Sequence, residues 1–547
     1  MSWFPLCNYT HYSLQRAYSK PDELAAKCAA NGYEACGIAD YKSISGAVDH
    51  FQACKAAKIK PIIGCAFDGF SLFSMNKEGW FDLIKIVSSI DKDENFDLKY
   101  MQEICDHGNL LLVGVEGIPD GNFPVCEHMI LRSPAFPEIY YTNKEDAHLH
   151  RILLCSGMKT TLPKINTDLK SGKVIENERF FRSDEYYLWS KQELEGLDQS
   201  DPIGLRTLER INGLCDDYNI LSTPILPAFP TPDGQSEEQY LKQLCRDGWR
   251  KILVPLGKVS TPEDIAIYKE RFETEFAVIK KAKLFGYFLI VQDILNWVRS
   301  QGWVVGPGRG SAAGCLISYL IGITEIDPIE FDLLFERFYN EGRNTDDHIS
   351  LPDIDMDVPA EKRDLVIAYM KRKYGEENVS QMITLGRFRG RSGLKEVLRV
   401  NAACGFAEMN EITKYVPDEA AISDQLEAMD EDERSIIMWA LINNADKLSD
   451  YCVLKEDGTL EGEYAEYFDQ AIKMEGTYKS QGKHAAGVVI SAVPLHTVCP
   501  MVNQKNGEEK IAGLEMQRLE AIGQTKFDVL GLTLLDREMF IRRLLNE

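Results

Sequence analysis

The chain has 547 residues, 44% of them hydrophobic, and a formal net charge of −24. A chain of this length needs more than one hydrophobic core, and it has neither an apolar run that could cross a bilayer nor a signal peptide at its start, which excludes an integral membrane protein. Its 14 cysteines include no CxxC pair, so they indicate free thiols in a reducing compartment and not a disulfide framework.

Residues 1–222 alternate helical stretches with short apolar runs. Examples are ELAAKCAANGY before EACGIAD, and AVDHFQACKAAKI before KPIIGCAF. This alternation predicts an α/β unit with largely parallel strands. A Pro-rich stretch at 223–235 predicts a linker, and residues 236–300 have the 3.6-residue apolar spacing of helices.

A glycine-rich segment, VGPGRGSAAG at 305–314, lies between an apolar stretch and an apolar helix. Glycines allow a close approach of the backbone, and the start of the next helix offers free N–H groups to an anion. Arg309 and Ser311 would add a charge and a hydroxyl. The spacing fits neither a Walker loop nor a dinucleotide fingerprint, and alone such a turn is more often structural. It gains weight from an acidic segment that follows it.

That acidic segment is LPDIDMDV at 351–358. In a strand, Asp353, Asp355 and Asp357 would project to the same face. Three neighbouring carboxylates repel one another unless cations neutralise them, and oxygen ligands suit Mg²⁺. The alternative is a solvated acidic edge strand. It fits less well, because Ile354 and Met356 would then be its only buried positions.

Charge alternates along the rest of the chain. Basic residues recur between 387 and 399, and acidic residues crowd 408–470 in a mostly helical stretch. The net charge of −24 therefore leaves nucleic-acid binding open, because a globally acidic protein can hold DNA in one basic channel. Two apolar strands, HAAGVVIS and KFDVLGL, follow.

Segments between 223 and 540 resemble, in the same order, the family of bacterial DNA polymerase III alpha subunits, the C family of DNA polymerases. They are LPAFPTPDGQSEEQYLKQLC, FGYFLIVQDILNW, VGPGRGSAAG, ITEIDPIEFDLLFERF, LPDIDMD, GKHAAGVVIS and TKFDVLGL. The resemblance implies a multidomain α/β and α+β fold. Its parts would be a PHP-like α/β barrel domain at 1–222, a linker at 223–235, a palm of the polymerase beta nucleotidyltransferase type with a mixed sheet at 236–395 and 480–547, and an inserted helical thumb at 396–479.

The resemblance also implies the catalytic residues. Asp355 and Asp357 would be the first two catalytic aspartates and Asp528 the third, and together they would bind two Mg²⁺ ions. Asp353 would have a supporting structural role. The residues agree on Asp528, because a lone acid inside the apolar strand KFDVLGL needs a cation or a donor. The alternative for Asp528 is an exposed strand position.

Further positions are implied to contact substrates, although each basic residue taken alone is more often a solvated surface charge. The positions for the incoming triphosphate are Arg309, Gly310, Ser311 and Lys526. The positions for DNA or nucleotide are Lys483, His484, Arg391 and Lys395. Two features depart from the family pattern: about four extra residues around Thr345–His348, and Val358 in place of the usual Phe.

The N-terminal region resembles the family's PHP domain, whose active members bind metals through His, Asp and Glu. Most ligand positions are lost here, since imidazoles cannot be replaced by tyrosines without changing charge and geometry. We therefore expect a scaffold without a PHP-site metal and without phosphoesterase activity. The replaced positions are Cys7, Tyr9, Tyr41, Ala66 and Tyr140; Asp40 is kept, and His11, His148 and His150 are scattered nearby.

The function implied is that of a template-directed DNA polymerase, which adds dNTPs to the 3′ end of a primer by a two-metal mechanism. Only 19 residues follow Asp528, so the fingers are expected on a separate C-terminal chain, through which a sliding clamp would be reached. A natural split is favoured, because the chain starts at Met and ends after a helical stretch. The expected location is the bacterial cytoplasm, or that of an infected bacterium for a viral source. The alternatives are a catalytically idle DNA- or polymerase-binding module and a PHP-type phosphoesterase.

Overall fold

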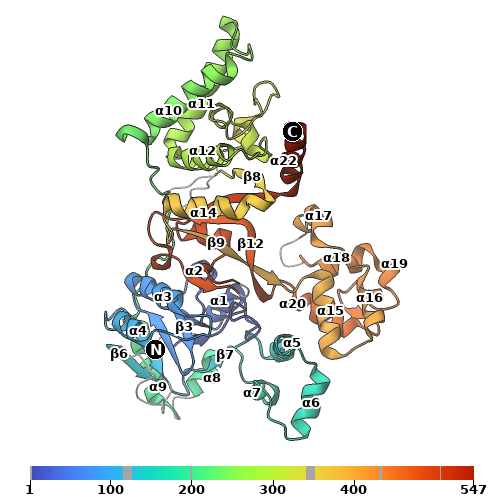
Figure 1. Cartoon of the computed structure of the whole chain (residues 1–547). Coiled ribbons are helices and arrows are strands. Elements are labelled where there is room, and N and C mark those ends of the chain that lie inside the picture. Colours follow the sequence, from blue (N-terminus) through green and yellow to red (C-terminus); the bar gives the residue numbers. More distant parts are fainter. Residues whose placement is uncertain are drawn as a thin grey trace. The chain divides into compact units, whose positions relative to one another are not determined.

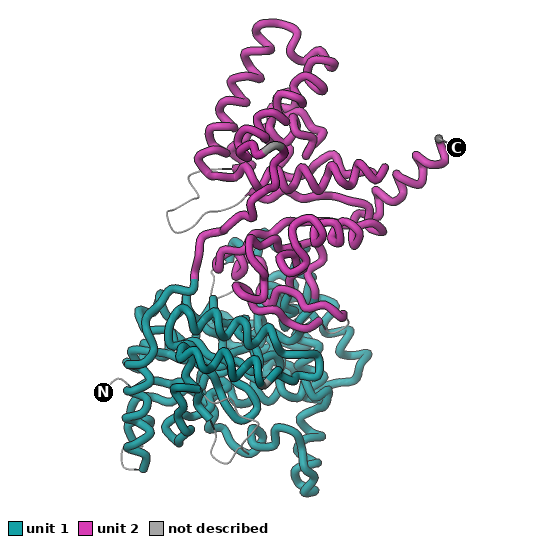
Figure 2. The backbone as a smooth tube through the Cα atoms, turned by 60° about the vertical axis from the view of Figure 1, so that its left-hand side comes forward, with its two compact units in different colours: residues 1–220, 384–482 teal, residues 221–383, 483–547 magenta. Residues whose placement is uncertain are grey.

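The computed structural model describes residues 3–114, 126–196, 200–339, 352–429, 434–504 and 507–546. The chain forms two compact units (Figures 1 and 2). Unit 1 comprises Met1–Ile220 and Thr384–Gly482, and unit 2 comprises Leu221–Ile383 and Lys483–Glu547. The lengthened loop expected around Thr345–His348 lies outside the described residues.

The N-terminal part of unit 1 is built around a five-stranded sheet in the order β2-β3-β4-β5-β6. Its strands are β2 Ala35–Tyr41, β3 Lys60–Phe67, β4 Phe70–Ser74, β5 Leu110–Gly114 and β6 His128–Leu131. The helices of this part are α1 Pro21–Ala30, α2 Ala47–Ala56, α3 Lys77–Ser89, α4 Leu98–Cys105, α5 Ala147–Gly157, α6 Leu162–Lys170, α7 Glu178–Arg182, α8 Lys191–Glu195 and α9 Pro202–Leu214.

The sheet is only partly parallel, which corrects the expectation of largely parallel strands. β2 pairs with β3 and β5 with β6 in parallel, but β4 is antiparallel to both β3 and β5. The cause is local: Asp68-Gly69 is a two-residue hairpin signal, and Gly69 has φ +91. The short strands β1 Cys7–Asn8 and β7 Glu138–Ile139 form a separate parallel pair. The closed barrel stays an expectation of the resemblance.

The helical stretch assigned to the thumb belongs to unit 1, where it shares a hydrophobic core with the N-terminal region. Ser156 Oγ donates to Glu396 over 2.6 Å, and Arg399 donates to the carbonyl oxygen of Thr160 over 3.2 Å. The elements of this stretch are α15 Gly390–Asn401, α16 Phe406–Thr413, α17 Ser423–Glu427, α18 Ile436–Asn443, α19 Ala445–Leu448, β10 Val453–Leu454, β11 Leu460–Glu461 and α20 Ala465–Met474.

The sheet that carries the candidate site has the order β13-β14-β9-β12-β15-β8. β12 and β15 are antiparallel whereas β15 and β8 are parallel, so the sheet is mixed, as expected. Its strands are β8 Asp355–Pro359, β9 Val379–Arg387, β12 Tyr478–Ile490, β13 Met501–Asn503, β14 Lys510–Ala512 and β15 Thr525–Leu532.

The helices of unit 2 are α10 Glu237–Gly248, the π-helical turn Trp249–Leu253, α11 Pro262–Lys281, α12 Phe285–Ser300, α13 Leu316–Leu320, α14 Arg363–Tyr374, α21 Met516–Ala521 and α22 Thr533–Asn546. Residues of α10, the π-helical turn, α11, α12, α13 and α14 form a second hydrophobic core with residues of β8 and β15.

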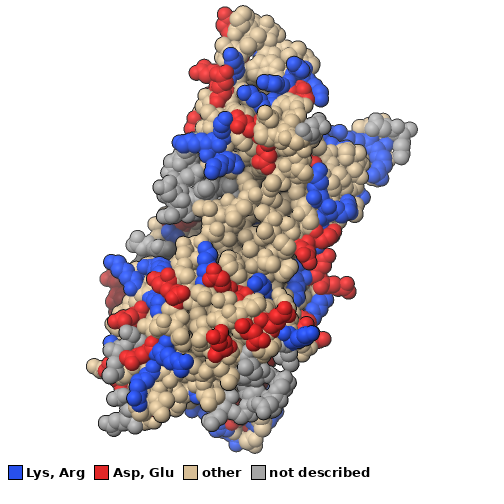
Figure 3. All heavy atoms as spheres, turned by 90° about the vertical axis from the view of Figure 1, so that its left-hand side faces the viewer, with Lys and Arg blue, Asp and Glu red and all other residues tan. Residues whose placement is uncertain are grey.

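On the face drawn in Figure 3, acidic and basic side chains are interspersed. None of the helices in the described ranges combines the length and the apolar composition that crossing a membrane requires.

Candidate active site

Three of the expected acids lie on two neighbouring strands of unit 2. Asp355 and Asp357 are two residues apart in β8, so they point to one face of the sheet. Asp528 in β15 is the register partner of Asp355. Asp353 precedes the first residue of β8, which differs from the expected acidic strand that included it. The pairing of β8 with β15 thus places Asp355 next to Asp528, although the two are far apart in the sequence.

The carboxylates that come closest are those of Asp353, Asp355 and Asp528. One oxygen from each lies within 4.8 Å of the others. Asp357 is outside this triangle and only 7% exposed. The cluster therefore includes Asp353, which the sequence analysis gave only a structural role.

The glycine loop approaches β8 directly. The backbone N–H of Gly306 donates to the carbonyl oxygen of Asp357 over 3.0 Å. A Cβ atom at position 306 would lie 2.6 Å from Cβ of Asp357, so a side chain there would displace the strand. Gly308 and Gly310 have φ of +96 and +64, a region that favours glycine. Gly306 therefore serves close packing against the acidic strand, whereas Gly308 and Gly310 serve the backbone conformation of the loop.

Arg309 lies on this loop and contacts two of the acids. Its Nη2 is 3.0 Å from Oδ1 of Asp355, and its Nε is 3.2 Å from both carboxylate oxygens of Asp357. Ser311 and Gly310, beside it, are exposed. The sequence analysis expected Arg309 to meet a triphosphate; in this structure its partners are carboxylates.

Lys526 contacts the other acids. Its Nζ is 2.6 Å from Oδ2 of Asp528 and 3.7 Å from Oδ1 of Asp353. It also lies 2.8 Å from the sulfur of Met516, and its side chain is 8% exposed. β15 and β8 are parallel, with Asp528 opposite Asp355. Lys526 and Asp353 each lie two residues before these partners, so the two side chains come to the same level. Two cations thus face four acids.

The electrostatics of the cluster favour a bound cation. Loss of hydration raises the pKa of Asp355, Arg309 opposes this shift, and the nearby Asp528 and Asp357 add to it. In addition, Oδ1 of Asp528 is buried and accepts no hydrogen bond. A buried carboxylate oxygen without a donor is costly, and a hard divalent cation would satisfy it. The donor set, all carboxylate oxygens, fits Mg²⁺.

A buried ion pair that the sequence analysis missed holds the segment after the loop. Glu275 is completely buried and accepts hydrogen bonds over 3.0 Å from the backbone N–H groups of Leu316 and Ile317. Arg271 pairs with Glu275 over 2.6 Å and donates to the carbonyl oxygen of Gly314 over 2.7 Å. A signal was present, because Glu275 interrupts the apolar face of helix 262–281 four residues after Arg271.

A second buried contact holds β15 in place. Arg363 Nε donates to the carbonyl oxygen of Val529 over 2.8 Å, and its Nη2 donates to that of Ala486 over 3.3 Å. The arginine thus joins β15 to β12 one residue after Asp528. The strand that carries Asp528 is therefore tied to β12 by a side chain as well as by the backbone pairing.

The other basic residues expected near substrate are divided between the two units. In unit 1, Arg391 donates twice to the carbonyl oxygen of Val416, and Lys395 donates to Asn410 over 2.7 Å. In unit 2, Nδ1 of His484 accepts the backbone N–H of Gly487 over 2.8 Å. Lys483 is exposed on β12. Their role in binding DNA stays a prediction.

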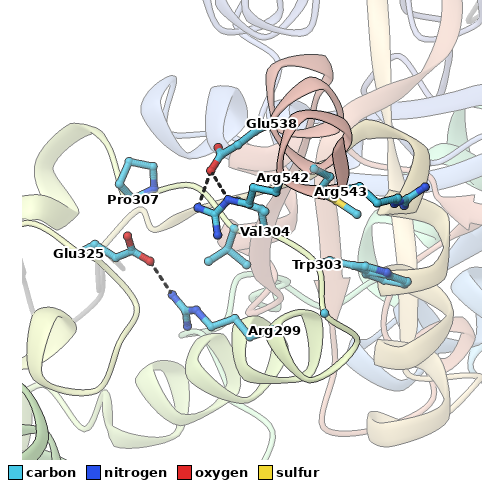
Figure 4. Close-up of a pocket in the computed structure, with 11 residues that line it drawn as sticks. Arg299, Trp303, Val304, Pro307, Glu325, Glu538, Arg542 and Arg543 are labelled. Carbon is cyan, nitrogen blue, oxygen red and sulfur yellow. Dashed lines mark hydrogen bonds and ion pairs between the residues drawn. The ribbon is translucent and has the colours of Figure 1, made fainter. Parts of the chain in front are cut away.

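A cavity of about 720 Å³ lies beside the glycine loop in unit 2. Residues 302–307, the end of α12 and one face of α22 line it (Figure 4). Two of the three arginines that line it have acidic partners: Arg299 lies 3.8 Å from Glu325, and Arg542 lies 2.6 Å from Glu538. These ion pairs are separate from the carboxylate cluster and distinguish the two arginines from Arg309.

The residues that the sequence analysis aligned with PHP ligand positions lie in the interior of unit 1 or at its edge. Cys7 and Ala66 are buried, and Tyr9 stacks on Tyr140 with ring centroids 4.5 Å apart. Glu138 is bound by two arginines. Nε2 of His150 lies 2.7 Å from the carbonyl oxygen of Arg16, and burial lowers the pKa of His150 to about 4. The absence of a PHP-site metal stays a prediction.

A second group of potential metal ligands in unit 1 consists of Cys36, His50 and Cys54. All three are completely buried. Nε2 of His50 is 3.0 Å from the carbonyl oxygen of Cys36 and 3.5 Å from the sulfur of Cys54. Because this nitrogen already serves a backbone carbonyl, we interpret the group as core packing.

The one retained acid, Asp40, is completely buried and fully hydrogen-bonded. It accepts the N–H of Thr10 over 2.7 Å, the Thr10 hydroxyl over 2.7 Å and the Ser13 hydroxyl over 2.6 Å. Burial raises the pKa of Asp40 to about 6, against the opposing effect of these donors. Asp40 thus joins the N-terminal segment to the end of β2.

This pKa predicts how stability depends on pH. The folded state keeps the Asp40 proton that the unfolded chain has lost, so the linkage contribution is full below the ordinary pKa and disappears as pH rises through about 6. We expect the difference in unfolding free energy between wild type and Asp40→Asn to fall by about 1 kcal/mol from pH 5 to pH 7. Urea unfolding of both proteins measures it. A difference that does not change with pH would contradict the assignment.

Comparison with known proteins agrees with both parts of the chain. The PHP domain family matches residues 6–132, and the family described as bacterial DNA polymerase III alpha NTPase domain matches residues 239–531. Relatives named DNA polymerase III subunit alpha occur in Aquifex aeolicus (strain VF5), 28% identical over 98% of this chain and 52% of the relative, and in Bacillus subtilis (strain 168), 29% identical over 97% and 48%. The relative in Escherichia coli (strain K12) is 28% identical over 96% and 48%. The chain spans about half the length of the curated relatives it matches.

Proposed function

Since this chain belongs to the family of the bacterial DNA polymerase III alpha NTPase domain, which matches more than half of it, we propose that it supplies the catalytic centre of a template-directed DNA polymerase. The reaction is the addition of dNTPs to the 3′ end of a primer, with release of pyrophosphate. The observation that carries the proposal is the meeting of Asp355 with Asp528 on paired strands, next to a glycine loop that presents Arg309.

The acids are the residues that would hold metal. Asp355, Asp357 and Asp528 would bind two Mg²⁺ ions, which, when bound, supply activation of the 3′-hydroxyl and charge stabilisation at the phosphates. The buried Oδ1 of Asp528, which has no hydrogen-bond partner, supports the assignment of Asp528, and the cluster of Asp353, Asp355 and Asp528 within 4.8 Å supports that of Asp355 and Asp528. Asp353 adds a fourth acid near the same site.

The basic side chains would meet the substrates. Arg309, with a planar guanidinium on an exposed loop, suits the triphosphate. Gly310 and Ser311 leave room beside it, since nothing lies within 4 Å of a Cβ at position 310. Lys526 is the cation nearest to Asp528 and would neutralise charge there. The remaining DNA contacts proposed are those of Lys483, His484, Arg391 and Lys395.

Full activity would need the half of the relatives that this chain does not span. That half would carry the fingers and the route to a sliding clamp, on a separate chain as the sequence analysis expected or on the same polypeptide. The PHP-like region would act as a scaffold, because Asp40 is saturated by donors from Thr10 and Ser13.

Primer extension tests the proposal. The protein is purified from its native source with the polypeptides it holds, and is given primer–template DNA, Mg²⁺ and dNTPs. We expect products that copy the template and stop at the position of an omitted dNTP. The preparation must also contain polypeptide that corresponds to the part of the relatives this chain does not span. If such a preparation does not extend the primer, or extends it regardless of template, the proposed function is wrong.

A further inference from the structure

The four acids of the candidate site are only partly neutralised, by two cations that are held in different ways. Lys526 is 8% exposed and is fixed between Asp528 and Met516. Arg309 is 45% exposed, and its guanidinium contacts two carboxylates: Asp355 through Nη2 and Asp357 through Nε. One cation is therefore part of the interior, and the other can leave it.

The backbone around Arg309 allows such a movement. Gly308 and Gly310 flank the arginine, and both have positive φ. Gly310 borders open space, and Ser311 is exposed. By contrast, Gly306 is packed against Asp357, which anchors the start of the loop. The loop thus has a fixed beginning and an exposed, glycine-flanked arginine.

We propose that Arg309 is an exchangeable counter-ion of the carboxylate cluster, which leaves Asp355 and Asp357 when a divalent cation binds there and is then free to bind phosphate. This inference rests on the proposed function, because it assumes a cation site at these acids. It adds an order of events: the arginine becomes available for the triphosphate only in the metal-loaded site.

The physical reason is competition for the same oxygens. The guanidinium contacts Oδ1 of Asp355 and both oxygens of Asp357, and these two acids are among those proposed to hold a divalent cation. Two cations on one carboxylate also repel each other. The coupling is reciprocal: the factor by which the arginine contact weakens metal binding is also the factor by which bound metal weakens the arginine contact. A released guanidinium matches a phosphate group in charge and shape.

The test is Mn²⁺ binding to the full chain without nucleotide, measured by calorimetry or by electron paramagnetic resonance. We expect Arg309→Ala to bind Mn²⁺ about tenfold more tightly than wild type, within the usual range of coupling between two sites. Arg309→Lys keeps the charge without the planar two-point contact and should lie between them. Arg542→Ala is the matched control: it removes the same charge from unit 2, but this arginine pairs with Glu538, so affinity should not change.

The wild-type protein gives a second readout. Phenylglyoxal modifies accessible guanidinium groups, and mass spectrometry follows the peptide that contains Arg309. We expect Mg²⁺ to increase the modification rate of Arg309 while that of Arg542 stays constant.

The outcomes separate the inference from the proposed function. If wild type binds Mn²⁺ and Arg309→Ala binds it equally or more weakly, the exchange is overturned and the metal site stands. If Mg²⁺ lowers or does not change the reactivity of Arg309, the exchange is likewise overturned. If neither wild type nor Arg309→Ala binds Mn²⁺, the proposed metal site itself is wrong.

Discussion

Replacing Asp355 or Asp528 by asparagine is expected to reduce primer extension roughly a thousandfold, the scale of losing a main electrostatic contact in a catalytic site. The two residues are register partners in β8 and β15, so each variant removes one of two negative charges that face each other. Asparagine has nearly the same shape, and the loss should therefore be one of charge and metal affinity, with the fold kept. Extension assays with wild-type and variant polymerase at saturating dNTP measure it.

Asp364→Asn provides the matched control for this prediction. Asp364 is also an acid of unit 2, but its side chain is 94% exposed on α14. Its replacement should leave the rate of primer extension within about twofold of wild type, because the charge of an exposed acid is screened by water and contributes little to stability. Mn²⁺ binding should weaken in Asp355→Asn and Asp528→Asn alone. An Asp528→Asn protein that extends primers at the wild-type rate would refute the assignment of this acid.

The positions of these acids could be predicted because strand geometry is local. Side chains two residues apart share a face, which places Asp355 with Asp357 without any knowledge of the rest of the fold. An acid inside an apolar strand needs a partner, which singles out Asp528. Asp353 departs from this pattern: it precedes β8, and yet its carboxylate joins the cluster. The position of Asp353 therefore does not follow from the alternation of side chains along a strand.

The partners of the cations could not be predicted in this way. Arg309 and Asp357 are separated by 48 positions, and their contact depends on how closely Gly306 packs on β8. Composition shows that the loop is basic and the strand acidic; it does not show that one neutralises the other. The same holds for the helical stretch at 396–479, whose packing on the N-terminal region follows from tertiary contacts such as Ser156 with Glu396.

The antiparallel strand β4 was missed for a different reason. Its hairpin signal, Asp68-Gly69, was present, but the alternation of helices and strands around it favoured a parallel sheet. A two-residue turn cannot connect parallel strands, because such a connection needs a crossover. The local turn chemistry therefore decides the strand direction here, against the average pattern of the region.

Replacing Arg271 by methionine is expected to destabilise unit 2 by about 3–5 kcal/mol, the cost of leaving a buried charge without its partner. Glu275 would remain completely buried in the core. Its carboxylate oxygens would still accept hydrogen bonds from the backbone N–H groups of Leu316 and Ile317, but the guanidinium that balances its charge would be gone. Burial already raises the pKa of Glu275, and losing Arg271 would raise it further. Urea unfolding at neutral pH measures the loss.

Two further variants separate the charge effect from a packing defect. Lys269→Met removes a cation from the same helix, α11, where Lys269 and Glu273 form an exposed pair at 3.8 Å, and should cost less than about 1 kcal/mol. The double variant Arg271→Met/Glu275→Gln removes both buried charges and should recover much of the loss, because a neutral pair carries no uncompensated charge. If the double variant is as unstable as Arg271→Met alone, the arginine acts through its bond to the Gly314 carbonyl and not through Glu275. In that case the start of α13, and with it the glycine loop, depends on a backbone contact more than on the buried ion pair.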